Sequence, residues 1–176
     1  MRQNEVPLPD GGGYDRLSIV GKQVTTNSNG LPEAPRDLVH GEVSLRFVEY
    51  VPLDGRGGLA PFYHFKIQAG SAGEVGHINF RIGSSEHVQL CAGHIGYRIE
   101  EKFRGHGYAL QACRALAPFV RSIYPEVLLT CNPDNYASAK TIERLGAVFI
   151  DEVAVPKHDP GYSKGARRKR RYRWQP

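Results

Sequence analysis

Apolar and polar residues follow two different periods along the chain. Alternation with a period of two, which is typical of half-buried strands, recurs four times before residue 100. It predicts strands at about 43–51, 62–69, 74–82 and 92–99. From about 106 to 122 the apolar residues recur at helical spacing, and another strand pattern follows at 127–131. This helix therefore fills a crossover, for which a right-handed β-α-β unit is expected.

Three more elements complete the pattern. A second helix begins at Asn135 and ends at Gly146, and strand patterns then cover 147–155 and 168–174. Residues 1–40 differ from the rest because they are rich in Gly, Pro, Asn and Ser. We expect an irregular or partly disordered leader at 1–40 and a single domain at 41–176, since the length leaves room for one core.

The composition fits a soluble globular protein, with 40% hydrophobic and 23% charged residues. No apolar run approaches the roughly 20 residues needed to cross a bilayer. The first residues also lack the apolar region of a signal peptide. We therefore expect a cytoplasmic protein with no membrane partner.

The cysteines do not form a disulfide framework, because Cys91, Cys113 and Cys131 are widely spaced and each lies in an apolar or strand-like context. Cys91 and His94 have a separation that could suit two ligands of a metal ion. No second ligand pair accompanies them, so the sequence predicts no metal site.

The turn between the fourth strand and the first helix reads Arg104-Gly105-His106-Gly107-Tyr108-Ala109. The first amides of a helix have no carbonyl partner within it, and the helix dipole adds partial positive charge there. Gly105 and Gly107 let the backbone approach a ligand closely and can take positive φ angles, while Arg104 adds a cation. The turn therefore predicts a phosphate-binding site, although such turns also serve ordinary packing.

Together with the second helix, this turn resembles the signatures of the GCN5-related N-acetyltransferases (GNAT). Residues 104–109 match the family's Arg/Gln-x-x-Gly-x-Gly/Ala signature. Asn135-Tyr136-Ala137-Ser138, followed by Glu143-Arg144-Leu145-Gly146, is similar to the Asn-x-x-Ser…Glu-x-Leu-Gly helix of the branch that includes ribosomal-protein acetyltransferases. The resemblance covers residues 73–155. It implies an α/β fold with a mixed, mostly antiparallel central sheet of about six to seven strands and flanking helices.

The resemblance also implies a function, which is direct transfer of acetyl from acetyl-coenzyme A to an amine in a ternary complex. Near 97–99, the end of the fourth strand would supply the amide that stabilises the oxyanion. The acceptor stays open between a protein N-terminus, a lysine, a polyamine, an amino sugar and another small amine. The residues expected to bind the cofactor are Ile99, Arg104, Gly105, His106, Gly107, Tyr108, Ala109, Asn135 and Ser138.

A protonated amine has a pKa near 10.4 and must lose a proton before it can attack. The family often has a carboxylate near the start of the fourth strand, and His94 is the closest titratable side chain, so we expect His94 to be the base. The equal alternative is a strand histidine that only makes hydrogen bonds. Glu74 and Glu100 are weaker candidates.

The proton donor is less clear from the resemblance, because Ile142 stands where many members have a tyrosine. Ser138 is the expected acid, and the equal alternative is a hydroxyl that hydrogen-bonds the backbone or the cofactor in the first turn of its helix. Tyr97 and Tyr136 are further donors. We expect Asn135 to cap its helix and to hydrogen-bond the pantetheine arm.

The chain departs from the family between its first two strands, where 52–61 is too short for the two helices that usually wall the acceptor site. The leader or a second subunit could supply this wall, which makes a homodimer a hypothesis, or the site could be open to a large acceptor. A coenzyme A-binding protein without transferase activity is the alternative function.

The net charge of +5 is concentrated in the basic run 167–171. Such a run suggests a nucleic-acid-binding module. The alternation of polar and aromatic residues that follows it instead favours a terminal edge strand kept soluble by cations, which we prefer.

Overall fold

The computed structural model describes residues 26, 30–53 and 59–176. The chain forms two units, at 1–33 and 34–176. In the first, Thr26 pairs with Pro32 in an isolated antiparallel bridge. Most of the expected leader lies outside the described residues. Its last residues belong to the second unit, where Leu38 is buried and a short strand follows.

The first sheet of the second unit has five strands in the order β1-β2-β3-β4-β5, and every neighbouring pair is antiparallel. Buried and partly exposed residues alternate along β3, as the period of two predicts. The sequence prediction is confirmed for all four long strands, although β5 begins three residues later than expected. The strands are β1 (Val39–His40), β2 (Val43–Val51), β3 (Phe62–Ala69), β4 (Gly73–Arg81) and β5 (Ile95–Ile99).

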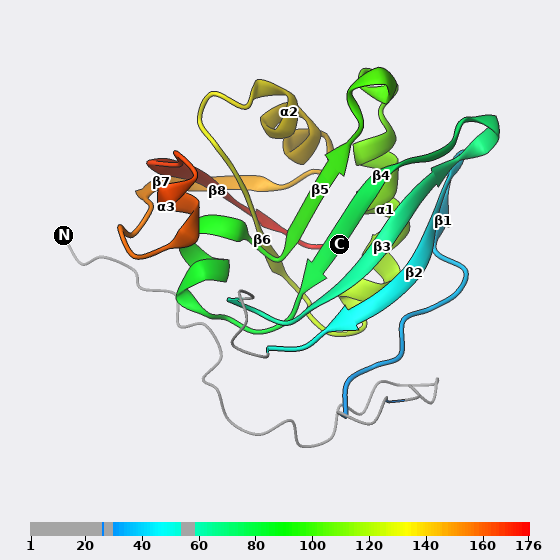
Figure 1. The fold of residues 1–176 in the computed structure, drawn as a ribbon, viewed down its shortest axis with the longest axis horizontal. Helices are drawn as coiled ribbons and strands as arrows, with labels where there is room; N and C mark the ends of the chain where they lie inside the picture. Colours follow the sequence, from blue (N-terminus) through cyan, green and yellow to red (C-terminus); the bar gives the residue numbers. More distant parts are fainter. Residues whose placement is uncertain (1–25, 27–29, 54–58) are drawn as a thin grey trace. The chain divides into compact units, whose positions relative to one another are not determined.

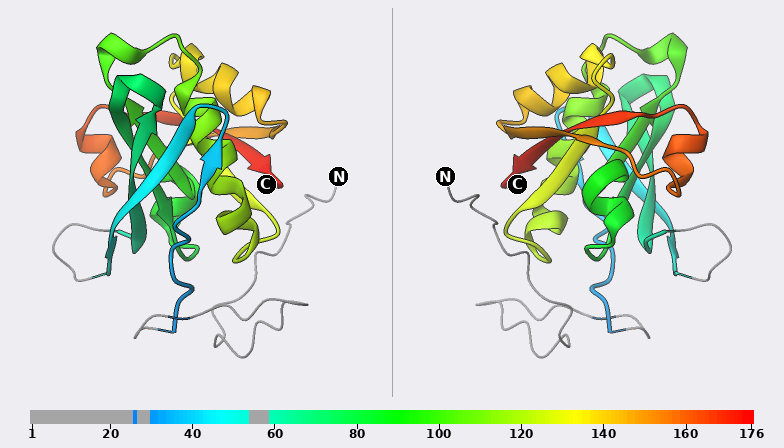
Figure 2. Two further views of the ribbon diagram at one scale, coloured as in Figure 1. Left: turned by 90° about the vertical axis from the view of Figure 1, so that its right-hand side faces the viewer. Right: turned by 90° about the vertical axis from the view of Figure 1, so that its left-hand side faces the viewer.

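The helix α1 (Tyr108–Arg121) packs against one face of this sheet (Figures 1 and 2). Phe119 of α1 lies at the centre of an aromatic cluster, with ring centroids 4.9 Å from Tyr63 and 5.7 Å from Phe80. Its edge-to-face geometry is the favourable one for aromatic pairs. This cluster fixes α1, and therefore the turn that precedes α1, relative to the sheet.

The second sheet has three antiparallel strands in the order β6-β8-β7. The strands are β6 (Val127–Cys131), β7 (Val148–Ala154) and β8 (Arg168–Trp174). The helix α2 (Tyr136–Arg144) connects β6 to β7, and the short α3 (Pro160–Ser163) lies between β7 and β8. The predicted α/β class with mostly antiparallel strands and flanking helices is confirmed, and its strands divide into two sheets.

The basic run is part of the central strand of the second sheet, so the prediction of an edge strand is wrong. Its arginines pair with acids of the neighbouring strand: Arg168 and Arg170 contact Glu152, and Arg171 donates two hydrogen bonds of 2.7 and 2.6 Å to Asp151. The Arg171 hydrogen bonds lower the pKa of Asp151. Because several of its cations are committed to ion pairs within the sheet, the run has a structural role, and the nucleic-acid hypothesis gains no support from it.

The described residues between β2 and β3, which are 52–53 and 59–61, contain no helix. This agrees with the expectation that the two helices usual at this place are missing. Within the described ranges no helix is both long and apolar enough to cross a membrane. The cytoplasmic location stays a prediction.

Candidate active site

The strands β5 and β6 meet at their starts and then separate (Figure 1). At the meeting point the His94 amide donates to the Leu128 carbonyl over 2.7 Å, and the Leu128 amide donates to His94 Nδ1 over 3.1 Å. Farther along, the two strands belong to different sheets. The distance between the two backbones therefore widens towards the glycine turn and the start of α2, and this backbone gap separates β5 from β6 (Figure 1).

The glycine turn occupies the wide end of this gap. Gly105 and Gly107 have φ angles of 86° and 76°, and a Cβ at either position would meet no atom of the described residues within 4 Å. Glycine is therefore required by the left-handed backbone rather than by lack of space. Gly107 is the N-cap of α1 and makes no side-chain cap. The amides of 105–107 find no acceptor among the described residues, which leaves them available to an anion.

The side chains of the turn fasten it to its surroundings. Arg104 Nε donates to the Ile99 carbonyl at the end of β5, over 3.2 Å. His106 Nδ1 lies 3.0 Å from the Arg104 carbonyl, and the imidazole stacks on Tyr108 with a centroid distance of 5.4 Å. Tyr108 is buried, so only its backbone can contact a ligand here, and Ala109 follows it in the first turn of α1.

The start of α2 faces β5 across the gap. Asn135 Oδ1 accepts a hydrogen bond of 3.0 Å from the Ser138 amide, which confirms that Asn135 caps the helix. The Ser138 hydroxyl lies 3.3 Å from the Tyr97 hydroxyl, so a hydrogen bond joins α2 to β5. Burial raises the pKa of Tyr97 to about 12, and its hydroxyl therefore stays protonated at neutral pH. Tyr136, another donor considered from the sequence, is 74% exposed.

Asn132, directly after β6, was not identified from the sequence. Its Oδ1 atom is buried and has no hydrogen-bond donor among the described residues. An unsatisfied buried acceptor costs about 1–3 kcal/mol, so its presence suggests a donor that the chain itself does not supply. No sequence signal distinguishes it, because an asparagine after a strand usually serves a turn.

An open pocket of about 350 Å³ lies on the β3-β4-β5 part of the first sheet, at the end of β5 that leads to the glycine turn. A Cβ at Gly76 would overlap the Arg98 carbonyl oxygen, so glycine is needed for the close approach of β4 to β5. Burial lowers the pKa of His77, and the nearby His64 and Lys66 add to this effect. The pocket is lined by Lys66, Glu74, Gly76, His77, Arg98, Glu100 and Glu101.

Comparison with protein families identifies the family to which the chain belongs. Residues 38–148, more than half of the chain, match the acetyltransferase (GNAT) domain. The chain belongs to the GNAT family. The GNAT match includes both the glycine turn and the start of α2, and it confirms the resemblance drawn from the sequence. A comparison with curated proteins gives no match.

Solved GNAT structures share the fold at low sequence identity. The microcin C7 self-immunity acetyltransferase, solved with acetyl-CoA and AMP, has a TM-score of 0.52 at 18% identity over 65% of this chain and 61% of that one. The ribosomal-protein-S5-alanine acetyltransferase of Vibrio fischeri has a TM-score of 0.51 at 20% identity, over 65% of this chain and 64% of that one. The Salmonella typhimurium acetyltransferase that modifies the N-terminal serine of ribosomal protein L7/L12 has a TM-score of 0.51 at 22% identity, over 70% of this chain and 67% of that one. The chain spans less than two thirds of the first two structures.

The environment of His94 does not support its expected role as the base. Its side chain is buried, its Nδ1 accepts the Leu128 amide proton, and its ring contacts Tyr124 with a centroid distance of 5.3 Å. Burial lowers the pKa of His94 to about 4. These contacts favour the alternative of a hydrogen-bonded strand histidine, which joins the starts of β5 and β6.

The weaker candidates for the base have different surroundings. Glu74 accepts a hydrogen bond of 2.6 Å from Lys66 and lies 3.5 Å from Arg46, and the Lys66 contact lowers its pKa. Such a carboxylate is a poor proton acceptor. Glu100 lines the pocket together with His77. Sequence reasoning did not select His77, because only the paired strands place it beside the end of β5.

Proposed function

We propose that this GNAT chain transfers acetyl directly from acetyl-coenzyme A to an amine, with both substrates bound at once. The observation that carries the proposal is the set of open amides at 105–107, placed before α1 at the wide end of the gap between β5 and β6. A pyrophosphate would accept hydrogen bonds from these amides and gain from the helix dipole. The Asn132 Oδ1 atom would accept a hydrogen bond from an amide N–H of the pantetheine arm.

Residues on both sides of the gap would do the chemical work. The thioester supplies an activated acetyl group, and the chain must stabilise the oxyanion and the departing sulfur. We assign the oxyanion contact to the backbone at the end of β5, next to Ile99. We assign the donor for the departing sulfur to the Tyr97 hydroxyl, with Ser138 holding it in place over 3.3 Å. Both hydroxyls lie where β5 and α2 face each other.

The amine would enter from the pocket of 350 Å³. Its carboxylates, Glu100 and Glu101, attract an ammonium group, and the lowered pKa of His77 leaves a neutral imidazole to take up the proton. Because the described residues between β2 and β3 form no helix, we favour a large acceptor such as the amino terminus of a protein. Two of the structures with the same fold are named for acetylating ribosomal proteins, which is consistent with this choice.

The test is calorimetric titration of acetyl-coenzyme A and coenzyme A into the purified protein, followed by an acetylation assay on peptides and small amines. We expect saturable micromolar binding of one ligand per chain and turnover with peptide amino termini. No binding to a folded protein would overturn the proposal. Binding without turnover on any amine would identify a coenzyme A-binding protein instead, a result that the buried Ile142 at the family's tyrosine position would help to explain.

The same assay examines the base. A His77→Gln variant should lose the acidic limb of the pH–rate profile, while His64→Gln, which changes a histidine on the same sheet outside the pocket, should keep it. An unchanged profile in His77→Gln would move the role to another group.

A Tyr97→Phe variant should lower kcat by about 100-fold or more with little change in the affinity for acetyl-coenzyme A, because a positioned proton donor contributes about 10²- to 10⁴-fold to the rate. The ring stays in place and only the hydroxyl is lost. Steady-state kinetics and calorimetry on the same protein check this. Tyr162→Phe is the matched control, because it removes the same hydroxyl from α3, in the connection between β7 and β8. Equal kcat in Tyr97→Phe and wild type would remove Tyr97 from the mechanism.

A further inference from the structure

A second cluster of reactive side chains lies at the opposite end of β5 from the glycine turn. His87 and Cys91 come from the β4–β5 connection, and Asp159 comes from the β7–β8 connection just before α3. A ring nitrogen of His87, Cys91 Sγ and a carboxylate oxygen of Asp159 all lie within 4.8 Å of one another. Cys91 and Asp159 are each only 4% exposed. Nothing in acetyl transfer requires this group.

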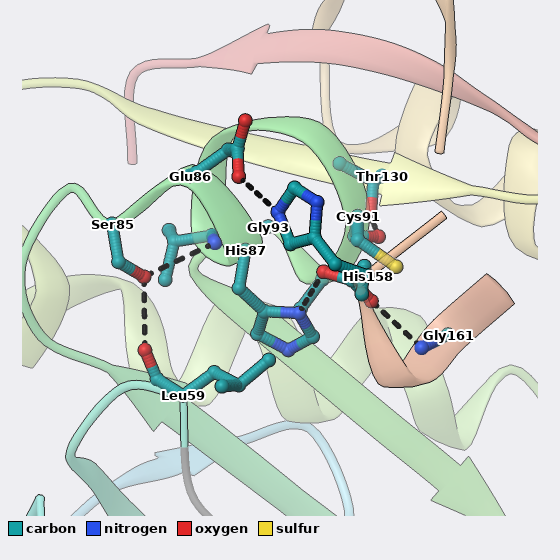
Figure 3. Close-up of polar contacts among 12 residues, drawn as sticks. Leu59, Ser85, Glu86, His87, Cys91, Gly93, Thr130, His158 and Gly161 are labelled. Carbon is teal, nitrogen blue, oxygen red and sulfur yellow. Dashed lines mark hydrogen bonds and ion pairs between the residues drawn. The ribbon is translucent and has the colours of Figure 1, made fainter. Parts of the chain in front are cut away.

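The backbone holds each member in place. His87 and Cys91 are four residues apart on one helical turn, so their side chains share a face (Figure 3). The Thr130 hydroxyl donates to the Cys91 carbonyl over 2.8 Å and fixes that residue against β6. On the other segment, the Gly161 amide donates to Asp159 Oδ1 over 2.7 Å, which leaves Oδ2 directed at His87 Nδ1.

Gly161 shows how closely α3 approaches the cluster. A Cβ at this position would overlap Cys91 Sγ and lie 2.9 Å from Asp159 Oδ1. Its φ angle is not in the left-handed region, so the close approach alone accounts for the glycine. A second contact, between His158 Nε2 and Glu86 Oε2 at 2.7 Å, joins the same two segments beside the cluster. The two connections are therefore held together at two points.

We propose that His87, Cys91 and Asp159 bind one divalent transition metal ion of the zinc class, through Nδ1, Sγ and a carboxylate oxygen. Thiolate and imidazole ligands favour zinc or cobalt over magnesium and calcium, and one carboxylate is a common third ligand. His87 is the most exposed of the three side chains, at 21%, so the fourth position opens to water on its side.

Binding requires a small rearrangement. His87 Nδ1 and Asp159 Oδ2 are 2.7 Å apart as hydrogen-bond partners, whereas two ligands of one tetrahedral zinc ion lie about 3.4 Å apart, given metal–ligand bonds near 2.1 Å. The ion therefore replaces the proton between them, and the two atoms separate by less than ~1 Å. The sequence prediction of no metal considered Cys91 with His94. Folding instead brings Cys91 to His87, and to Asp159 from a distant connection.

The ion would act as a clamp between the two sheets. The β4–β5 connection belongs to the five-stranded sheet and the β7–β8 connection to the three-stranded one. A ligand that binds only the folded chain stabilises it, because the unfolded chain does not hold the three groups together. The clamp lies at the narrow end of the gap and leaves the wide end free.

The test is titration of Zn²⁺ and Co²⁺ into the full chain after removal of metal with a chelator. We expect one ion per chain with micromolar or tighter affinity, a thiolate-to-cobalt charge-transfer absorption, and a rise of Tm by several degrees with zinc. Cys91→Ser should abolish the absorption. Cys131→Ser, which replaces another buried cysteine that has no such partners among the described residues, should retain it.

A His87→Gln variant keeps the thiol and serves if Cys91→Ser does not fold. It should lower zinc affinity by at least ~10-fold, because loss of an outer-shell partner alone typically costs about 10- to 100-fold and His87 is proposed as a direct ligand. The proposal is overturned if the folded wild type binds no ion, or if the cobalt absorption persists in Cys91→Ser. In either case the cluster is a metal-free hydrogen-bonded junction.

Discussion

Replacing Gly107 by tryptophan is expected to weaken acetyl-coenzyme A binding at least ~100-fold, which corresponds to about 2.7 kcal/mol. Gly107 has a φ of 76° and open space around its Cα, so the indole would project into the region that the pyrophosphate needs. It would separate the anion from the amides of 105–107, and each lost charge-assisted hydrogen bond costs about 1.5–3 kcal/mol. Calorimetry with acetyl-coenzyme A measures the change.

The control for this variant must carry the same backbone strain. Gly165 has a φ of 96°, and an added Cβ there would likewise meet none of the structurally described residues within 4 Å, but Gly165 follows α3, far along the chain from the turn. A non-glycine residue in this conformation costs about 1–3 kcal/mol at either position. Gly165→Trp should therefore lose similar stability and keep its affinity. If both variants bind as tightly as wild type, the cofactor does not lie on the glycine turn.

The stability of the domain is expected to fall as the pH drops from about 6.5 to 4, because of His94. Its pKa is about 4 in the folded chain, against an ordinary value of 6.5. The unfolded chain thus takes up a proton that the folded chain refuses, and protonation favours unfolding across this range. The contribution of neutral His94 to the free energy of unfolding is fully present above pH 6.5 and is lost below pH 4. It amounts to about 3 kcal/mol, of which about 2 kcal/mol is lost by pH 5.

Denaturant unfolding at several pH values checks this expectation. In a His94→Asn variant the amide oxygen can still accept the Leu128 amide proton, but the side chain no longer titrates. Its stability should start lower and change less between pH 7 and pH 5 than that of wild type. If the free energy of unfolding changes with pH equally in wild type and in the variant, His94 does not titrate in this way.

Local patterns along the chain were enough to predict most elements of the domain. Strands β2, β3, β6 and β8 have the predicted bounds, because alternation is a property of neighbouring residues. The start of β5 was placed too early, since Val88–Ala92 forms a π-helical turn that no period identifies. The central place of β8 was also missed. The order of strands in a sheet depends on distant pairings, and the arginines of β8 gave no sign that acids of β7 would face them.

Some features of the candidate site could likewise be predicted from local sequence, and others depend on contacts between distant segments. The glycine turn and the Asn135 cap are local motifs, and both were located from the sequence. The contact between Tyr97 and Ser138 spans 41 residues, and only the separation of β5 from β6 brings it about. The role of His94 depended on burial and on Leu128, which lies on another strand. Residue type alone could not distinguish a proton acceptor from a buried hydrogen-bonded ring.

The position of β8 has a consequence for the order of assembly. In the second sheet β6 and β7 are not neighbours, since each pairs with β8, which follows both in the sequence. The first sheet and α1 have all their ladder partners by residue 121. During synthesis the segment up to residue 121 can therefore consolidate early, while β6, α2 and β7 reach their final arrangement only after β8 has been made. The phosphate-binding turn would be ready before the side of the gap that faces it.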